Sequence, residues 1–504
     1  MRWGRKPLGY IASIVAMTST LFGLEWIRVN PATPIEFAYL SLLGIALVPL
    51  SLLFVSTIAY VVMRPTAFPR AEVRDWPRVA ILYVAYNDAL LDPIRMTVRN
   101  LGYPNAEVWL LSDSNRPESR ELEETVSSGV RIFRRPTRRG GKAGAINDWL
   151  LRYGSNVRYI VPMDADAVLA PSSLRTMVET AEHRDNLRFA GFQTLMEVHP
   201  AVAPSPFARI LGRSVKWGCR IVPLANQRLF GQGMYWGSNA LLRVDVVSAV
   251  GGWVEDTICE DFALTARLDA AGHPIALLDL YNYEGFPPDA LSLRERTVRW
   301  CKANLSVAPS IFRSKTSFAV RLNATIPILF YLMAPTLIAL LVINIVAPPD
   351  APLHRTSTVL GAALLAFVFL HRLVVVPRSR ESFAQFVATL GVETLVILGF
   401  GLRIAWSFVE SLLHAPSWVP SRKETRHLSL FESVAHSIPE LVFGALLLAL
   451  LVVYHAPLQT VALSSVWVVS FLSTPAILWL TSRSPTARPG GRVFRAVRER
   501  TISF

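Results

Sequence analysis

The segment Val161-Pro162-Met163-Asp164-Ala165-Asp166-Ala167 decides how the rest of the chain is interpreted. The apolar run at residues 159–163 predicts a buried strand, and two carboxylates, Asp164 and Asp166, follow where that strand should end. Open α/β sheets bind their ligands at the carboxyl ends of strands. Mg²⁺ is commonly held by one or two carboxylates together with substrate phosphates. The pair therefore predicts a metal–diphosphate site, although an exposed turn would give the same three residues.

The composition indicates an integral membrane protein. The chain has 504 residues, of which 52% are hydrophobic, and its mean hydropathy is +0.36. Only 17% of its residues are charged, against about 25% in soluble domains. Residues 37–63 and 322–349 contain no Asp, Glu, Lys, Arg or His, and each exceeds the roughly 20 apolar residues that span a bilayer. Spans are predicted at residues 8–27, 37–63, 322–346, 356–376, 434–454 with a kink at Pro439, and 461–480.

The distribution of charge fits a membrane protein better than a nucleic-acid-binding one. The formal net charge is +14, but the basic residues flank the apolar runs and gather in the tail at residues 483–504. This is the positive-inside pattern, which places both termini in the cytoplasm. We therefore expect no nucleic acid among the partners. Cys219, Cys259 and Cys301 show neither a disulfide nor a zinc spacing, which fits a reducing compartment.

Residues 383–413 are apolar but interrupted by Glu393, Arg403 and Glu410. If every apolar segment crossed the membrane, the arginine-rich tail would lie outside, against the charge rule. We therefore predict that this segment lies on the cytoplasmic face as an interfacial helix or a re-entrant hairpin. The alternative is that it forms one more span.

Between the spans, residues 70–313 form a polar domain that is large enough to have its own core. Short apolar runs alternate there with helical segments, which predicts an α/β domain with a mostly parallel mixed sheet inserted between transmembrane α-helices. Strands are expected at residues 79–85, 106–112, 130–133 and 159–163, and helices at 93–101, 142–151 and 171–182. The other parts would be a transmembrane hairpin (1–69), transmembrane and interfacial helices (314–482) that include a gating-type loop (414–430), and a basic cytoplasmic tail (483–504).

Further chemical groups follow the predicted strands. Tyr86 comes after the first strand and Asp113 after the second. Gly140-Gly141-Lys142 stands at a helix start, where backbone N–H groups and a cation would cradle phosphate oxygens. An ordinary glycine loop with solvated arginines would give the same sequence.

Three more motifs lie downstream. Residues 231–240 combine glycines with aromatic rings that suit a sugar, although core aromatics beside a turn would look alike. Glu260-Asp261 opens a helix expected at 261–271, where acids also complement the helix dipole. The arginines of 294–300 point to an anion, or equally to an exposed basic helix face.

The order of these motifs is more informative than any one of them. Tyr-Asn-acid, Asp, Lys-Ala-Gly-x-x-Asn, Asp-x-Asp, Gly-Ser-Asn-Ala, Glu-Asp and Arg-Trp, over residues 78–304, resembles the membrane-embedded family 2 glycosyltransferases, which include cellulose and hyaluronan synthases. Within that group the chain looks most similar to the osmoregulated periplasmic glucan glucosyltransferases. Arg296 replaces the glutamine of cellulose synthases, and Arg299-Trp300-Cys301 matches the Arg-Trp-Cys of that group. Residues 417–424 resemble its Trp-x-x-Gln-Arg-Asp-Asp loop more loosely.

The resemblance implies a GT-A fold and a role for each motif. Tyr86, Asp113, Lys142, Asp164 and Arg296 would bind the UDP-sugar donor, with Arg422 and Lys423 contacting the nucleotide from the gating-type loop. Asp164 and Asp166 would hold Mg²⁺ or Mn²⁺. Asp261, beside Glu260, would be the general base, and Arg299 would neutralise the leaving diphosphate. Trp236, Gly237, Ser238, Asn239 and Trp300 would bind the acceptor. Cys259 and Asp88 stand where relatives have threonine and glutamate, and neither is expected to touch the chemistry.

The implied function is an inverting, processive, metal-dependent hexosyltransferase of the bacterial inner membrane with its catalytic domain in the cytoplasm. It would transfer glucose from UDP-glucose to a growing β-glucan and export the product. Its partners would be the bilayer, the UDP-sugar, a glucan or glycolipid acceptor, and a periplasmic or acyl-carrier protein. Two alternatives are a single transfer to a lipid carrier or glycolipid, and a transporter with a nucleotide-sensing cytosolic domain.

Overall fold

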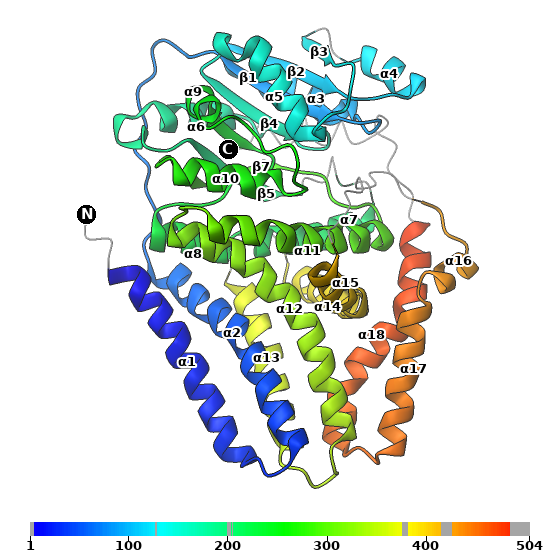
Figure 1. Cartoon of the computed structure of the whole chain (residues 1–504). Coiled ribbons are helices and arrows are strands. Elements are labelled where there is room, and N and C mark those ends of the chain that lie inside the picture. Colours follow the sequence, from blue (N-terminus) through cyan, green and yellow to red (C-terminus); the bar gives the residue numbers. More distant parts are fainter. Residues whose placement is uncertain are drawn as a thin grey trace.

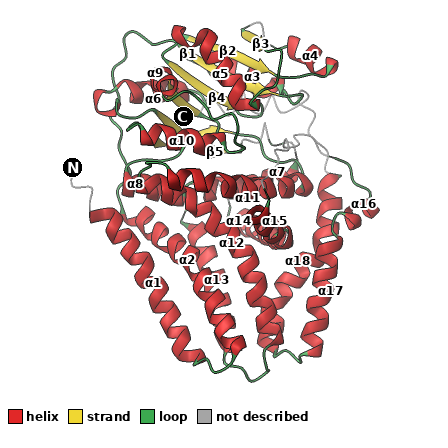
Figure 2. Ribbon diagram, in the orientation of Figure 1, coloured by secondary structure: helices red, strands yellow, loops and turns green. Residues whose placement is uncertain are grey.

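The computed structural model describes residues 5–126, 129–198, 203, 205–374, 382–414 and 426–483. It has three levels: an α/β domain, a layer of helices across the underside of that domain, and a bundle of long helices (Figure 1). Figure 2 shows that the strands are confined to the end of the molecule opposite the bundle.

The long helices agree with the predicted spans. Five helices in the described part of the chain are long and apolar enough to cross a membrane. They are α1 (Arg5–Val29), α2 (Pro34–Val62), α12 (Phe318–Val346), α13 (Leu353–Leu373) and α18 (Leu458–Ser482). The shorter α17 (Ile438–Val453) runs beside α18 (Figure 1), and the rings of Phe443 and Phe471 meet edge to face with centroids 5.5 Å apart.

The kink expected at Pro439 is wrong. The chain instead forms two helices, α16 (Leu430–Ala435) and α17, and Pro439 lies in the first turn of α17. Proline is tolerated in the first turn because the backbone N–H that it lacks has no acceptor within the helix. Pro439 therefore begins a helix and does not bend one.

The segment from residue 383 to 413 forms two helices, α14 (Phe383–Gly399) and α15 (Gly401–Leu413), bent by 47° at Phe400. Figure 1 shows this pair nearly end-on beneath the middle layer, across the direction of the long helices. A bent pair of this kind forms either a broken span or a re-entrant loop, so the interfacial or re-entrant placement of residues 383–413 stays a prediction.

The sheet has seven strands in the order β3-β2-β1-β4-β6-β5-β7. Strand β6 is antiparallel to both of its neighbours and every other pair is parallel, so the sheet is mixed and mostly parallel, as predicted. The strands are β1 (Val79–Ala85), β2 (Ala106–Ser112), β3 (Val130–Arg134), β4 (Tyr159–Asp164), β5 (Gly191–Glu197), β6 (Ala240–Arg243) and β7 (Ile275–Tyr283).

Helices cover both faces of the sheet because successive strand residues point to opposite sides. On β1, Ile81 and Tyr83 pack into one core and Leu82 packs into the other, which contains Trp149 and Trp253. The domain helices are α3 (Leu91–Asn100), α4 (Pro117–Glu124), α5 (Gly141–Tyr153), α6 (Ser173–Glu182), α9 (Val244–Ala249) and α10 (Glu260–Ala270). The middle layer contains α7 (Pro206–Gly218), α8 (Ile221–Phe230) and α11 (Ala290–Arg313) (Figure 1).

Candidate active site

The sheet register brings three of the predicted site residues to one edge. Ala85 pairs with Ser112 at the ends of β1 and β2, and Val84 pairs with Asp164 at the end of β4. Tyr86 and Asp113 therefore leave the sheet beside Asp164, at the carboxyl edge where ligands bind in open α/β folds.

A buried loop fixes the position of Asp164. Its backbone N–H donates to Ser238 Oγ at 3.1 Å, and the N–H of Asn239 donates to the carbonyl of Pro162 at 3.0 Å. Ser238 and Asn239 are completely buried, and Asn239 has a φ of 60°. Asparagine tolerates that left-handed conformation better than most residues do. The loop after Gly237 thus sets the position of the first acid.

Lys142 is the cation of this edge. It lies in the first turn of α5, which Gly140 initiates with a φ of 66°. Its ammonium donates to the Asp164 carboxylate and, at 2.9 Å, to the carbonyl of Gly237. The glycine-rich helix start predicted from the sequence therefore places a lysine on the acids that follow β4.

Asp261 reaches the same point from α10. A β-carbon added to Gly237 would lie 3.5 Å from Asp261 Oδ2 and 3.8 Å from Lys142 Nζ. The Asp261 carboxylate accepts from the N–H of Phe262 at 2.9 Å and from the Cys259 thiol at 3.4 Å. The acid after β4 and the acid of α10 therefore face one lysine.

The acids of α10 and the lysine of this cluster all have raised pKa values. Burial raises the pKa of Asp261, and burial together with the Asp261 charge raises the pKa of Glu260. Although burial disfavours its ammonium, Lys142 has a raised pKa because of the nearby Asp164 and Glu260. At neutral pH Lys142 stays charged, while Asp261 is a stronger base than an exposed aspartate.

Asp166 is held close to the start of the segment after β7. Val168 and Tyr283 form an isolated antiparallel bridge, which brings Gly285 against the Asp166 carboxylate. A β-carbon at Gly285 would clash with that carboxylate, so the glycine keeps space beside it. Carboxylate pairs are ligands that a hard divalent cation prefers when substrate phosphates supply its other ligands. Among the described residues, no group of three His, Cys, Asp or Glu side chains is arranged to hold a metal ion.

Helix α11 contributes cations and an aromatic ring. The Arg296 guanidinium lies between the rings of Phe286 and Trp300, 4.6 Å from each centroid. Burial lowers the pKa of Arg296 to about 10, against the opposing charges of Glu284 and Asp166. Burial also lowers the pKa of Arg299, and Asp164 opposes that shift. The Trp300 side chain is exposed, as an acceptor platform would be.

The edge at β1 and β2 is arranged differently. The Asp113 carboxylate is buried and accepts from two guanidinium nitrogens of Arg135, each at 2.6 Å. Arg135 also donates to the carbonyls of Arg139 and Gly141, at 2.8 Å each. In this structure Asp113 thus anchors the glycine loop through Arg135. The Arg138 guanidinium stacks over the Tyr86 ring, 3.7 Å from its centroid.

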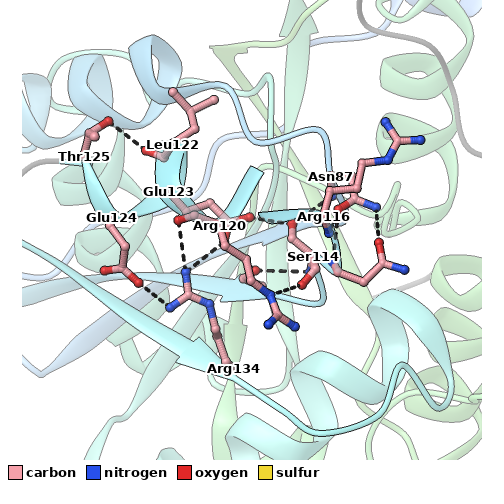
Figure 3. A network of polar contacts seen from close by, with 11 residues as sticks. Asn87, Ser114, Arg116, Arg120, Leu122, Glu123, Glu124, Thr125 and Arg134 are labelled. Carbon is pink, nitrogen blue, oxygen red and sulfur yellow. Dashed lines mark hydrogen bonds and ion pairs between the residues drawn. The ribbon is translucent and has the colours of Figure 1, made fainter. Parts of the chain in front are cut away.

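A polar network supports the loops of this edge (Figure 3). The side chain of Asn87, whose φ is 58°, accepts from the N–H groups of Asn115 and Arg116. Its own N–H donates to Ser114 Oγ, which in turn donates to the fully buried Glu123. The network ties the turn after β1 to the turn after β2.

Comparison with known proteins agrees with this geometry. Residues 159–376 match the family model described as glycosyl transferase family group 2. This part of the chain is therefore similar to family 2 glycosyltransferase domains. A protein of Vibrio cholerae named glucans biosynthesis glucosyltransferase H is 28% identical over 342 residues, which are 61% of this chain and 46% of that protein. A protein of Rhodopseudomonas palustris with the same name is 29% identical over 306 residues, 55% of this chain and 42% of that protein.

The chain spans about half the length of these curated relatives. Among solved structures, a mannosyltransferase of Pyrobaculum calidifontis in complex with GDP-Man and Mn²⁺ is similar, with a TM-score of 0.47 and 16% identity over 73% of this chain and 97% of that chain. A glucosyl-3-phosphoglycerate synthase of Mycobacterium tuberculosis gives a TM-score of 0.32 and 12% identity, over 53% of this chain and 85% of that chain. The described residues of the α/β domain form the mostly parallel mixed sheet expected from the sequence, with seven strands and with acids at its carboxyl edge.

The acceptor residues expected from the sequence divide into two groups. Ser238 and Asn239 lie beneath the surface and position Asp164, so this geometry gives no support to direct contact with an acceptor. Trp236 is partly buried and its N–H donates to Gln193 Oε1 at 2.9 Å. Gly237 borders Asp261, and Trp300 contacts Arg296. Arg422 and Lys423 lie outside the described residues.

Sequence reasoning missed two groups of the glycosyltransferase site. Glu284 directly follows β7, and its pKa is raised by burial and by the charges of Asp164 and Asp166. The rule that picked out Asp164 would also have found Glu284 had β7 been recognised as a strand. Cys259 was expected not to touch the chemistry, yet its thiol donates to Asp261. The start of α10 brings the side chains of Cys259 and Asp261 together, and their spacing in the sequence does not reveal this contact.

Proposed function

We propose that the chain transfers a glucosyl residue from UDP-glucose to a growing β-glucan with inversion, and passes the product across the membrane that its long helices span. The observation that carries the proposal is the convergence of Asp164, Lys142 and Asp261 around Gly237. A site of this kind holds a nucleoside diphosphate on one side and a base on the other. The relatives named glucosyltransferase H support a glucan as the product.

The donor would bind along the carboxyl edge of the sheet. Tyr86 offers a flat face for the nucleobase once Arg138 gives way or stacks on the far side of the base. Lys142 and Arg299 would neutralise the diphosphate as it leaves. Asp164 and Asp166 would hold Mg²⁺ or Mn²⁺, which supplies positive charge to the leaving group when bound.

The acceptor would enter from the side of α11. Trp300 gives an exposed ring on which a sugar can pack, and Asp261 would take the proton from the attacking hydroxyl. A single displacement with inversion needs one base and no protein nucleophile. The raised pKa of Asp261 strengthens the base, and the Cys259 thiol and Phe262 N–H fix its orientation.

Incubating the purified full chain with radiolabelled UDP-glucose and Mg²⁺ or Mn²⁺ tests the proposal. We expect release of UDP and labelled β-glucan of increasing length. A product that never exceeds one added sugar would support transfer to a lipid carrier or glycolipid. No transfer with UDP-glucose or any other nucleotide sugar would refute the enzymatic function and favour a nucleotide-sensing transporter.

A further inference from the structure

Helix α11 carries different groups on its two sides. Arg296 and Trp300 meet each other on the side of the active site, 4.6 Å from guanidinium carbon to ring centroid. Arg294, two residues earlier, is buried, and its guanidinium donates to the carbonyl of His436, which lies between α16 and α17. Figure 1 shows α11 lying across the top of the bundle, with α15 beneath it.

Arg294 joins an ionic cluster with Arg403 of α15 and Glu440 of α17, in which Arg294 and Glu440 are buried and the Arg403 side chain is 35% exposed. Arg403 Nε donates to Glu440 Oε1 at 2.9 Å, and Arg294 Nη1 lies 3.5 Å from the same oxygen. Both arginines also donate to the backbone carbonyl of His436, at 3.0 Å from Arg294 and 3.3 Å from Arg403. Three helices from separate parts of the chain therefore meet at two acceptors.

The Arg294–Arg403–Glu440 cluster joins helices at a cost in free energy, because buried charges lose their contacts with water. The Glu440 side chain is completely buried, and its Oε2 atom has no hydrogen-bond partner among the described residues. Replacing a buried ion pair by apolar groups often leaves stability unchanged or increased, so such pairs contribute geometry more than they contribute stability. The planar guanidinium groups fix distance and direction between the helices that they join.

We propose that the Arg294–Arg403–Glu440 cluster positions α11, and with it Arg296, Arg299 and Trp300, for the transfer reaction. The inference rests on the proposed function. None of the three members reaches the acids at the sheet edge in this structure, so they act through α11 as positioning residues. A movement of α15 or α17 would be passed to the site through the same contacts.

A second ion pair between α11 and α15 provides a matched control. Lys302 of α11 and Glu410 of α15 are 2.8 Å apart, but their side chains are 25% and 38% exposed. Exposed ion pairs contribute little because water screens them. Glu410→Gln removes a carboxylate from the α11–α15 contact without disturbing the Arg294–Arg403–Glu440 cluster.

The test compares Glu440→Gln with Glu410→Gln in the detergent-solubilised full chain, with activity expressed per folded molecule. We expect Glu440→Gln to lower kcat/KM roughly tenfold to a hundredfold, the cost of a misplaced catalytic group. Glu410→Gln should stay within about twofold of the parent because its ion pair is screened. In an Arg299→Ala background, Glu440→Gln should cost little more, because the group that it positions is already gone.

A milder variant covers the case in which Glu440→Gln folds poorly. Arg403→Lys keeps the charge but loses the two-pronged contact, and we expect an intermediate loss of kcat/KM with amide exchange in α11 faster than in the parent. Additive effects of Glu440→Gln and Arg299→Ala, or a Glu440→Gln enzyme whose activity falls only with its folded fraction, would overturn the proposal. An inactive parent chain would instead refute the proposed function, while α11 exchange in the variants would still report on the cluster.

Discussion

The two halves of the sheet's carboxyl edge hold their acids in opposite ways. Beside β2, the Asp113 carboxylate is almost completely buried and accepts two hydrogen bonds of 2.6 Å from Arg135, which also pairs with Asp148 at 3.0 Å. Beside β4, Lys142 is shared: it bonds Asp164 and is also held charged by Glu260 and Asp261, with the Asp164 side chain 37% exposed. A buried acid that accepts two hydrogen bonds from its cation stabilises the fold, whereas a partly exposed acid beside its cation leaves charge accessible to a substrate.

Of the changes to the two cations, removing Lys142 should have the larger effect on activity. Lys142→Met would leave the diphosphate without its ammonium, and we expect turnover to fall roughly 10²- to 10³-fold, as when one transition-state donor is lost elsewhere. Arg152→Met, at the far end of the same helix, is the control and should retain activity. Steady-state transfer rates with UDP-glucose measure both. Equal losses in the two variants would show that Lys142 acts only through α5.

Removing the cation that pairs with the buried Asp113 should affect folding more than chemistry. Arg135→Met leaves the buried Asp113 charge uncompensated, which costs about 3–5 kcal/mol of unfolding free energy. Thermal unfolding of the solubilised chain should show a lower midpoint, while donor affinity at low temperature changes less than in Lys142→Met. A full loss of donor binding in a stably folded Arg135→Met variant would erase the distinction between the two halves.

The pH profile should follow the acids that share Lys142. Asp261 must be deprotonated to act as a base, and burial raises its pKa, so transfer should decline as the pH falls through a range above that of an exposed aspartate. The measurement is kcat/KM for the donor from about pH 4 to pH 9, at constant metal concentration. A rate that stays constant down to about pH 4, the ordinary carboxyl range, would contradict the raised pKa.

The smallest effect is expected at Cys259. Burial and the Asp261 charge raise the pKa of its thiol, so it stays protonated and donates to Asp261 Oδ1. Cys259→Ala removes that weak donor and should lower kcat roughly two- to fivefold. Cys259→Ser keeps a donor and should restore the rate. If alanine and serine behave alike, the thiol contact has no part in orienting the base.

The sequence predicted the part of the fold that depends on burial. Strands β1, β2 and β4 are continuous apolar runs in the middle of the sheet, and each forms at its predicted place. Strands β5, β6 and β7 were not predicted. Strand β6 has four residues, and β7 contains Asp279 and the buried Asn282, whose amide donates to Thr194 and whose oxygen accepts from the N–H of Ala170. Polar groups satisfied by distant segments interrupt the pattern that marks a strand.

The candidate site was predictable to the same extent. Asp164, Lys142 and Asp261 were found because each stands at the end of a strand or the start of a helix, where backbone geometry aims a side chain outward. Glu284 was missed together with β7. Two contacts join segments that lie apart in the sequence, Arg135 with Asp113 and Arg294 with Glu440. The contact between Cys259 and Asp261 depends on the turn of the chain at the start of α10. Only the folded chain shows such contacts.

The central claim is that Lys142 faces Asp261 and that Asp261 is the base. Its most direct test is Asp261→Asn, with Asp245→Asn as the control because Asp245 is an exposed aspartate paired with Arg243. We predict that Asp261→Asn lowers transfer roughly 10²- to 10⁴-fold, the usual share of a general base, while UDP binding is retained. Asp245→Asn should transfer at the parent rate. An Asp261→Asn protein that still transfers glucose at the parent rate would contradict the account.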